Sequence, residues 1–309
     1  MKNLTPHTFH IPVMGLAYTI DTPIKVAKYG ITSVVSVIED YLIEQMREVI
    51  CKNEHIEYVK IHTTERDYRA KRITAYLNLI QDIIDKQIEE IKREDFNTGK
   101  DIIQYFEMLP EDSEIKKLYF KMLASQTREK EKLQKQLRHL IIPGKIDVNI
   151  MTKLDKTNYD ADGNELPTQF SDALSALRGY ANSNVNSSII FSAGLNPRLF
   201  SYCETFEDFY PDLKGFISKK IILKVSDYRS ALIQGKYLAK KGLWISEFRI
   251  ESGINCGGHA FISNGIPLGP ILEDFKSKRN ELYNELLVEC ENALKILGRN
   301  PFIIKPELK

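Results

Sequence analysis

The residues best suited to chemistry lie in one stretch of the chain, at positions 244–263. It opens with an apolar run rich in aromatic and β-branched residues, Trp244 to Ile250, which predicts a buried strand. The loop that follows, residues 252–259, combines three glycines with Cys256 and His259. Glycine lets the backbone approach a ligand closely, and a thiol beside an imidazole supplies reactive groups. The sequence therefore predicts a ligand-binding or catalytic loop at the end of a strand.

The composition is that of a globular protein without a dominant charge. The chain has 309 residues, 43% of them hydrophobic, and 43 basic residues against 42 acidic ones, for a formal charge of +1. Such a balance creates no general field for nucleic acid or an anionic membrane, so we expect neither as a partner. No stretch reaches the roughly 18 apolar residues of a membrane span, and the first 15 residues have no long apolar core after a basic start, so we expect neither a membrane span nor a secretion signal. We expect a soluble, cytoplasmic protein that acts on a small molecule.

The cysteines and histidines do not predict a metal site. The four cysteines lie far apart and form no CxxC pair, which argues against a disulfide framework and a zinc ribbon. His7 and His10 form an HxxH pair, but no acidic residue or cysteine stands near them to complete a ligand set. We therefore expect reduced thiols and no bound metal.

The elements that must position the loop alternate between strand and helix. A helix should begin at Thr22-Pro23, and a long one should follow the loop over residues 270–297. This alternation predicts a parallel α/β fold. The expected strands cover residues 10–15, 31–38, 146–151, 188–193, 221–225 and 244–250.

One helical stretch interrupts the alternation. Residues 40–143 place apolar side chains at helical spacing without a sustained heptad, which predicts amphipathic helices rather than a coiled coil. The longest should cover residues 65–93, and another residues 113–140. We therefore expect two parts: a (β/α) domain formed by residues 1–39 and 144–309, and a helical insertion formed by residues 40–143.

Four short motifs come in a fixed order along the chain. They are Pro12 to Gly15 ahead of Thr22-Pro23, then Asp147 to Met151, Lys220 to Val225, and Gly253 to His259. In this order they resemble the FMN-dependent TIM-barrel family that contains nitronate monooxygenases and flavin-type enoyl-acyl carrier protein reductases. That family has a P-(I/V)-(I/M)-x-G strand, a G-V-N-(L/I)-M strand, a K-(V/I)-x-x-x-V strand and a G-x-E-A-G-G-H signature.

The resemblance implies a fold, a cofactor and a set of site residues. The fold would be a TIM-barrel-like parallel β/α fold, and the activity an FMN-dependent oxidation or reduction of a small organic substrate. His259 would be the catalytic base or the group that polarises the substrate. The residues that would bind FMN are Met14, Gly15, Asn149, Lys224, Gly257 and Gly258.

The chain also departs from the family. Asn255 and Cys256 stand where the signature has glutamate and alanine. The glycine-rich turns that bind the flavin phosphate in the family, G-G-I and G-T-x-F, are absent from the sequence. A complete barrel needs about 250 residues, so outside the insertion the chain resembles a barrel that stops near its seventh strand.

These departures leave two other functions open. Cys256 and His259 could form the nucleophile and base of a hydrolase or an acyl-transfer enzyme. Alternatively, the chain could be a non-catalytic half-barrel that needs another chain to supply the missing strands, or that forms a homo-oligomer. Lys224, a charge in an apolar strand, fits either a ligand contact or an internal ion pair.

Overall fold

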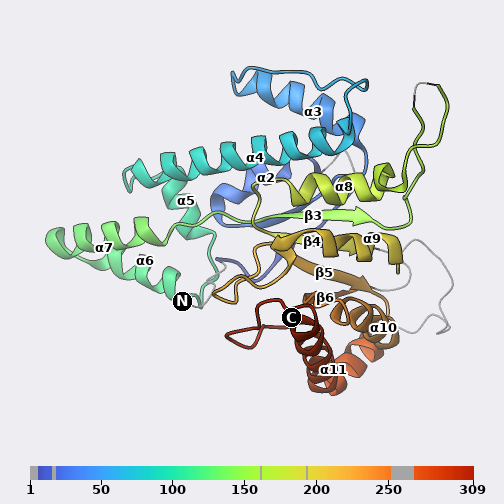
Figure 1. Ribbon diagram of the computed structural model, residues 1–309. Coiled ribbons are helices and arrows are strands. Elements are labelled where there is room, and N and C mark those ends of the chain that lie inside the picture. The colour runs from blue at the N-terminus through green and yellow to red at the C-terminus, as the bar shows by residue number, and fades with distance from the viewer. Residues whose placement is uncertain (1–5, 16–18, 161, 193, 252–267) are drawn as a thin grey trace. The chain divides into compact units, whose positions relative to one another are not determined.

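The computed structural model describes residues 6–15, 19–160, 162–192, 194–251 and 268–309 (Figure 1). They form an α/β fold in which six strands make one parallel sheet in chain order, as the alternation predicts. The strands are β1 (His10–Ile11), β2 (Thr32–Ser36), β3 (Ile146–Met151), β4 (Ser188–Ser192), β5 (Lys220–Val225) and β6 (Ile245–Ile250).

The helices between the strands also follow the expected order. The α-helices are α2 (Thr22–Val26), α3 (Asp40–Asn53), α4 (Tyr68–Arg93), α5 (Asp101–Glu107), α6 (Glu114–Ala124), α7 (Thr127–Leu140), α8 (Asp172–Ala181), α9 (Pro197–Tyr202), α10 (Tyr228–Ala239) and α11 (Leu268–Ile296). Short 3-10 helices are η1 (Ala27–Tyr29), η2 (Thr168–Phe170), η3 (Cys203–Thr205) and η4 (Glu207–Phe209).

Two sequence-based boundaries need correction. The helix predicted over residues 113–140 is in fact two helices, α6 and α7. The break falls at Ser125, whose backbone is extended and whose hydroxyl donates to the carbonyl of Lys121 at 2.8 Å. A serine that bonds its own preceding turn offers the backbone an alternative to continued helix. The strand predicted over residues 10–15 is also shorter, since β1 ends at Ile11.

The chain divides into two compact units. Unit 1 comprises Met1–Ser36, Tyr41–Lys60 and Ala75–Asp147, whereas unit 2 comprises Val37–Asp40, Ile61–Thr74 and Val148–Lys309. These sets cut across the expected insertion, so its boundaries at residues 40 and 143 stay a prediction.

Unit 1 contains the paired strands β1 and β2 and most of the helices from α3 to α7. Its core includes the stacked rings of Phe96, Phe106 and Tyr119, with centroids 5.9 and 5.4 Å apart in succession. The amphipathic pattern predicted for α4 is confirmed, because its apolar positions are all buried: Ile73, Tyr76, Leu77, Ile80, Ile84, Ile88 and Ile91.

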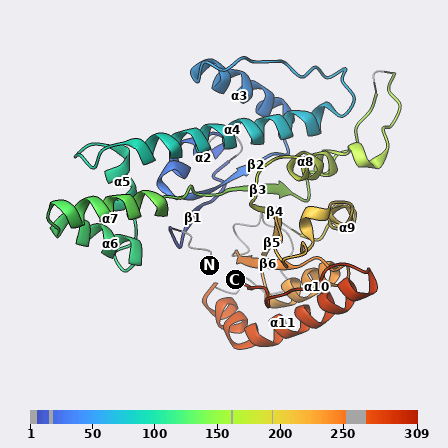
Figure 2. The same ribbon diagram turned by 60° about the vertical axis from the view of Figure 1, so that its left-hand side comes forward.

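Unit 2 contains β3 from Val148 onward, all of β4 to β6, and the helices that cover one face of them. Phe191 of β4 lies 4.9 Å, between ring centroids, from Phe200 of α9. Gly235 of α10 lies close to the ring of Phe248 in β6. Helices α10 and α11 lie side by side (Figure 2). This face of the unit 2 sheet is therefore the apolar core of the unit.

The outer edge of β6 is bonded to the last residues of the sequence. The amide of Phe248 donates to the carbonyl of Lys309 at 2.8 Å, and the amide of Lys309 donates to Ser246 at 3.0 Å. The indole of Trp244 donates to the carbonyl of Glu307 at 3.0 Å. Residues 307–309 therefore satisfy part of the edge that a neighbouring strand would otherwise cover.

Candidate functional site

The two faces of the unit 2 sheet differ in chemistry. Side chains alternate between faces along a strand, and paired residues of neighbouring parallel strands share a face. Val148, Ile189 and Ile221 are aligned on the apolar face. Buried parallel sheets usually carry apolar residues on both faces, so the opposite face stands out. We call it the polar face; its residues include Asn149, Ser188, Ser192, Lys220, Lys224, Glu247, Arg249 and Glu251.

The charged side chains of the polar face are paired. Lys224 forms an ion pair with Glu251, and Arg249 Nε donates to Glu247 Oε1 at 2.6 Å. Lys224 and Arg249 are direct register partners on β5 and β6. Charges in an otherwise apolar setting are costly unless they are paired or bind a ligand. Here two cations and two carboxylates stand together at the carboxyl ends of two adjacent strands.

Asn149 and Lys224 share the polar face. Asn149 is aligned through Ile190 with Ile222, two residues before Lys224. Two strand spacings and a two-residue offset put their Cα atoms about 12 Å apart. Asn149 is 5% exposed, whereas the Lys224 side chain is 23% exposed. The structure therefore brings these two predicted residues to one face of the sheet, within the length of a single flat ligand.

The loops at the carboxyl ends of β3 and β4 are tied together. Thr152 Oγ1 donates to the carbonyls of Ser192 at 2.9 Å and Gly194 at 3.0 Å. Asn196 Nδ2 donates to the carbonyl of Thr152 at 3.2 Å, and its Oδ1 caps α9 by accepting from Leu199 N at 3.1 Å. Parallel α/β folds bind ligands at this end of their strands. The loops that border the polar face there are therefore held together by hydrogen bonds.

The other predicted site residues lie in unit 1 or outside the described residues. Met14 and Gly15 belong to unit 1, where Met14 is 72% exposed and Gly15 has a φ of 143°, which favours glycine. The remaining four lie outside the described residues: Cys256, Gly257, Gly258 and His259. The proposals for a catalytic imidazole and for a nucleophilic thiol thus stay predictions.

Sequence reasoning missed part of the polar face. Glu247, Arg249 and Glu251 follow Trp244 in a run that reads as a buried strand, and they attracted no functional prediction. They alternate with Phe248 and Ile250, the period of a strand with one polar side. That alternation was the signal that could have found them.

The cysteines that the structure describes are unsuited to nucleophilic catalysis. Cys51, Cys203 and Cys290 are free and buried, as expected for reduced thiols. Burial raises the pKa of each thiol, that of Cys290 to about 12. A thiol must ionise to attack, so none of these three is a candidate nucleophile.

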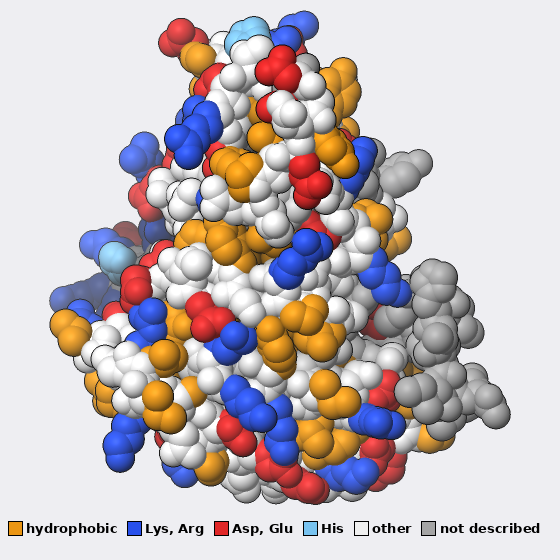
Figure 3. Space-filling model, turned by 45° about the vertical axis from the view of Figure 1, so that its right-hand side comes forward, with side chains coloured by type: hydrophobic (Ala, Val, Ile, Leu, Met, Phe, Trp, Pro, Cys, Tyr) orange, Lys and Arg blue, Asp and Glu red, His pale blue; other side chains and the backbone are white. Residues whose placement is uncertain are grey.

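The described residues form neither a metal-binding cluster nor a membrane-spanning helix. Within residues 6–15, 19–160, 162–192, 194–251 and 268–309, no three His, Cys, Asp or Glu side chains are grouped so that they could hold a metal ion. Across those same ranges, no helix has the length and apolar character to cross a membrane. Basic and acidic side chains are interspersed on the face shown in Figure 3.

Comparison with known proteins does not add a family. No protein-family model, no curated protein and no solved structure matches this chain.

Proposed function

We propose that the polar face is the cofactor site of an FMN-dependent oxidoreductase with a fold of TIM-barrel type. The observation that carries the proposal is the placement of Asn149 and Lys224 on one polar face of a parallel sheet. The opposite face of that sheet is apolar and covered by helices. In a barrel, the face away from the helices lines the interior, and the site lies at the carboxyl ends of the strands.

The side chains on the polar face fit the flavin ring. The ring has a pyrimidine edge of carbonyl and N–H groups, which an amide such as Asn149 and a cation such as Lys224 can bind. Their separation suits a flat ligand that spans two strands. The Arg249 guanidinium on this face is paired with Glu247, so we expect the phosphate contact to come from other parts of the chain.

The ion pair gives Lys224 a defined role in this proposal. FMN, when bound, would supply the electron-transfer chemistry. Lys224 would donate a hydrogen bond to the ring edge, since its ammonium has three N–H donors and the pair with Glu251 does not use all of them. Glu251 would hold the ammonium in position, because it already pairs with Lys224 in the described structure.

Titration of the purified chain with FMN, followed by quenching of flavin fluorescence, tests the proposal. We expect Lys224→Gln to weaken FMN binding about tenfold, since it replaces a charge-assisted hydrogen bond by a neutral one. The matched control is Lys276→Gln on α11, an equal charge change at a side chain that is 77% exposed. Equal FMN affinities in the wild type and both variants would show that Lys224 does not contact FMN. If none of the three proteins bound FMN saturably, the proposal would be refuted.

A further inference from the structure

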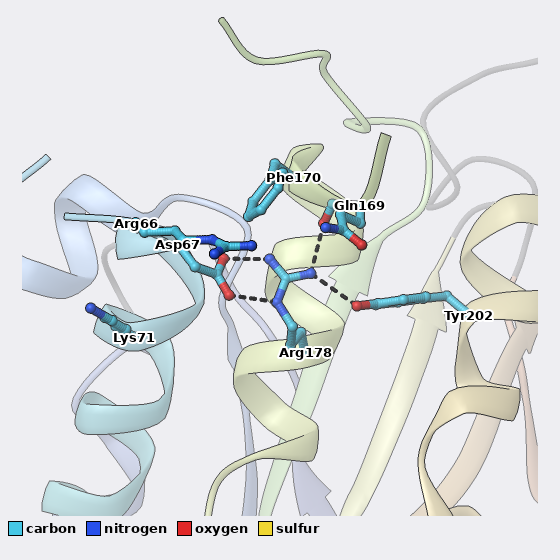
Figure 4. A pocket seen from close by; sticks show the side chains of 7 residues that line it. All are labelled: Arg66, Asp67, Lys71, Gln169, Phe170, Arg178 and Tyr202. Atoms are coloured by element: carbon cyan, nitrogen blue, oxygen red, sulfur yellow. Dashed lines mark hydrogen bonds and ion pairs between the residues drawn. The ribbon is translucent and has the colours of Figure 1, made fainter. Parts of the chain in front are cut away.

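A separate cleft in unit 2 has no role in the proposed flavin site. It has a volume of about 330 Å³ and is formed by the segment before α4, the first turn of α4, η2, α8 and α9 (Figure 4). Its centre is Arg178 of α8, which lies against Asp67. All of these residues belong to unit 2.

The guanidinium of Arg178 is fixed on all sides. Nε donates to Asp67 Oδ2 at 2.6 Å, and Nη2 bonds the other carboxylate oxygen. Nη1 donates to the carbonyl of Gln169 at 2.7 Å and to the hydroxyl of Tyr202 at 3.0 Å. Asp67 has a φ of 60°, the left-handed region that few residues other than glycine adopt. The Arg178–Asp67 pair therefore forms the floor of the cleft, and hydrogen bonds within the protein already hold its guanidinium in place.

Two aromatic rings flank this floor. The guanidinium carbon of Arg178 lies 5.4 Å from the ring centroid of Phe170 and 6.0 Å from that of Tyr202. Planar guanidinium groups and aromatic rings both favour stacking with a flat ligand. The cleft therefore offers flat surfaces to an aromatic ring.

Two further cations line the same cleft. Arg66 is exposed, and Lys71 is half-exposed with its ammonium 3.0 Å from Glu65 Oε2. With Arg178, the lining carries three positive charges against the single carboxylate of Asp67. Asp67 neutralises Arg178, whereas the solvent-exposed pair of Lys71 with Glu65 contributes little energy and can be exchanged for another anion. Arg66 and Lys71 are therefore the groups that can meet an anionic ligand.

We infer that this cleft binds a planar aromatic ring that carries a phosphate, a ligand of mononucleotide size. The ring would lie against Phe170, Arg178 and Tyr202, while the phosphate would be bound by Arg66 and Lys71. The volume lies at the lower end of the range for small-molecule sites, which suits one nucleotide better than two. This inference uses none of the residues of the polar face, so Lys224→Gln, which should weaken FMN binding at the polar face, should leave AMP binding in this cleft unchanged.

Isothermal titration with AMP tests the inference, with adenosine and inorganic phosphate as separate probes. We expect AMP to bind at least tenfold more tightly than either probe, because only AMP fills both parts of the cleft. Arg66→Gln combined with Lys71→Gln should weaken AMP binding about tenfold or more. Phe170→Leu should weaken AMP and adenosine but leave the affinity for phosphate unchanged.

Two controls keep the result specific. Lys240→Gln combined with Lys276→Gln makes the same charge change at exposed positions outside the cleft, and should leave AMP affinity unchanged. Tyr202→Phe keeps the ring while removing the hydroxyl, and should also retain binding. The inference is overturned if AMP binds no better than phosphate, or if the two double variants lose the same affinity.

Discussion

Two lysines in and beside β5, Lys224 and Lys219, show how different the environments of one residue type can be. Lys224, on the polar face, pairs with Glu251. Lys219, at the start of the same segment, is only 1% exposed, and its ammonium donates to the carbonyls of Ser183 and Val185, each at 2.9 Å. Burial lowers the pKa of Lys219 to about 8, although Asp208 acts in the opposite direction. The sequence marked Lys224 as unusual, but nothing in it distinguished Lys219 from its neighbour Lys220.

The buried ammonium should give folding a measurable pH dependence. The folded pKa of Lys219 is below its ordinary value of 10.5, so between about pH 8 and 10.5 the unfolded chain binds a proton that the folded chain lacks. Stability therefore rises with pH across this window, by roughly 3 kcal/mol when integrated, and the burial penalty is fully present below pH 8.

Urea unfolding of the wild type and of Lys219→Met at several pH values between 7 and 10.5 measures this rise. The other titrating groups are shared by the two proteins, so they cancel in the difference between the two free energies of unfolding. Lys219→Met should have the lower slope above pH 8. Curves that stay parallel over the whole range would show that Lys219 keeps an ordinary pKa.

At the scale of elements, α8 packs closely on the first turns of α4 through a glycine. A Cβ at Gly179 would lie 2.7 Å from Cβ of Ile73 and 2.9 Å from the carbonyl oxygen of Ala70. The hydroxyl of Thr74 donates to the carbonyl of Gly179 at 2.9 Å. Ion pairs join the same segments, with Arg69 3.2 Å from both Asp40 and Asp172. A larger residue at position 179 would push this arrangement apart.

Gly179→Ala should therefore destabilise the protein by about 1–3 kcal/mol, the usual cost of overpacking. Gly269→Ala in α11 is the matched control, because a Cβ there meets nothing within 4 Å and alanine favours helix. Thermal unfolding followed by circular dichroism should show a lower Tm for the first variant only. Equal Tm values for the two variants would mean that α4 and α8 can move apart enough to accept a Cβ at position 179 without loss of stability.

The edge of β6 gives a second prediction at this scale. Removal of residues 307–309 breaks two ladder bonds to β6 and exposes the surface that Leu308 covers, since Leu308 is 7% exposed. We expect a loss of about 2 kcal/mol or more in the free energy of unfolding, and self-association through the open edge.

Three measurements check this truncation. Gel filtration reports association, Tm reports stability, and the emission of Trp244 reports the lost bond to Glu307. Leu308→Ala keeps the backbone bonds, so it should lower Tm without causing association. A truncated chain that stays monomeric with an unchanged Tm and emission would show that these residues do not protect the edge.

At the scale of the whole molecule, periodicity predicted the elements well. The β/α alternation gave the six strands in order, and the apolar spacing of α4 identified the side chains that are buried. The break at Ser125 was missed because its cause is one hydroxyl–carbonyl bond rather than a pattern. The contact between Asp67 and Arg178 joins residues 111 positions apart, so no local signal could indicate the second cleft.

The candidate site was predicted only in part, for a similar reason. Asn149 and Lys224 were identified by resemblance, and the structure places them on one face. The ion pairs that give this face its charge depend on register between β5 and β6, which residue types alone do not determine. Of the residues that the resemblance implied, those from Cys256 to His259 lie outside the described residues and stay predictions.

The visible absorption spectrum of the purified chain, taken after incubation with FMN and desalting, tests the central claim most directly. The account predicts retained flavin bands with a stoichiometry near one per chain, and a reduced yield of bound flavin for Lys224→Gln. A colourless protein after desalting, from a sample whose circular dichroism shows a folded α/β protein, would contradict the assignment of the polar face as an FMN site.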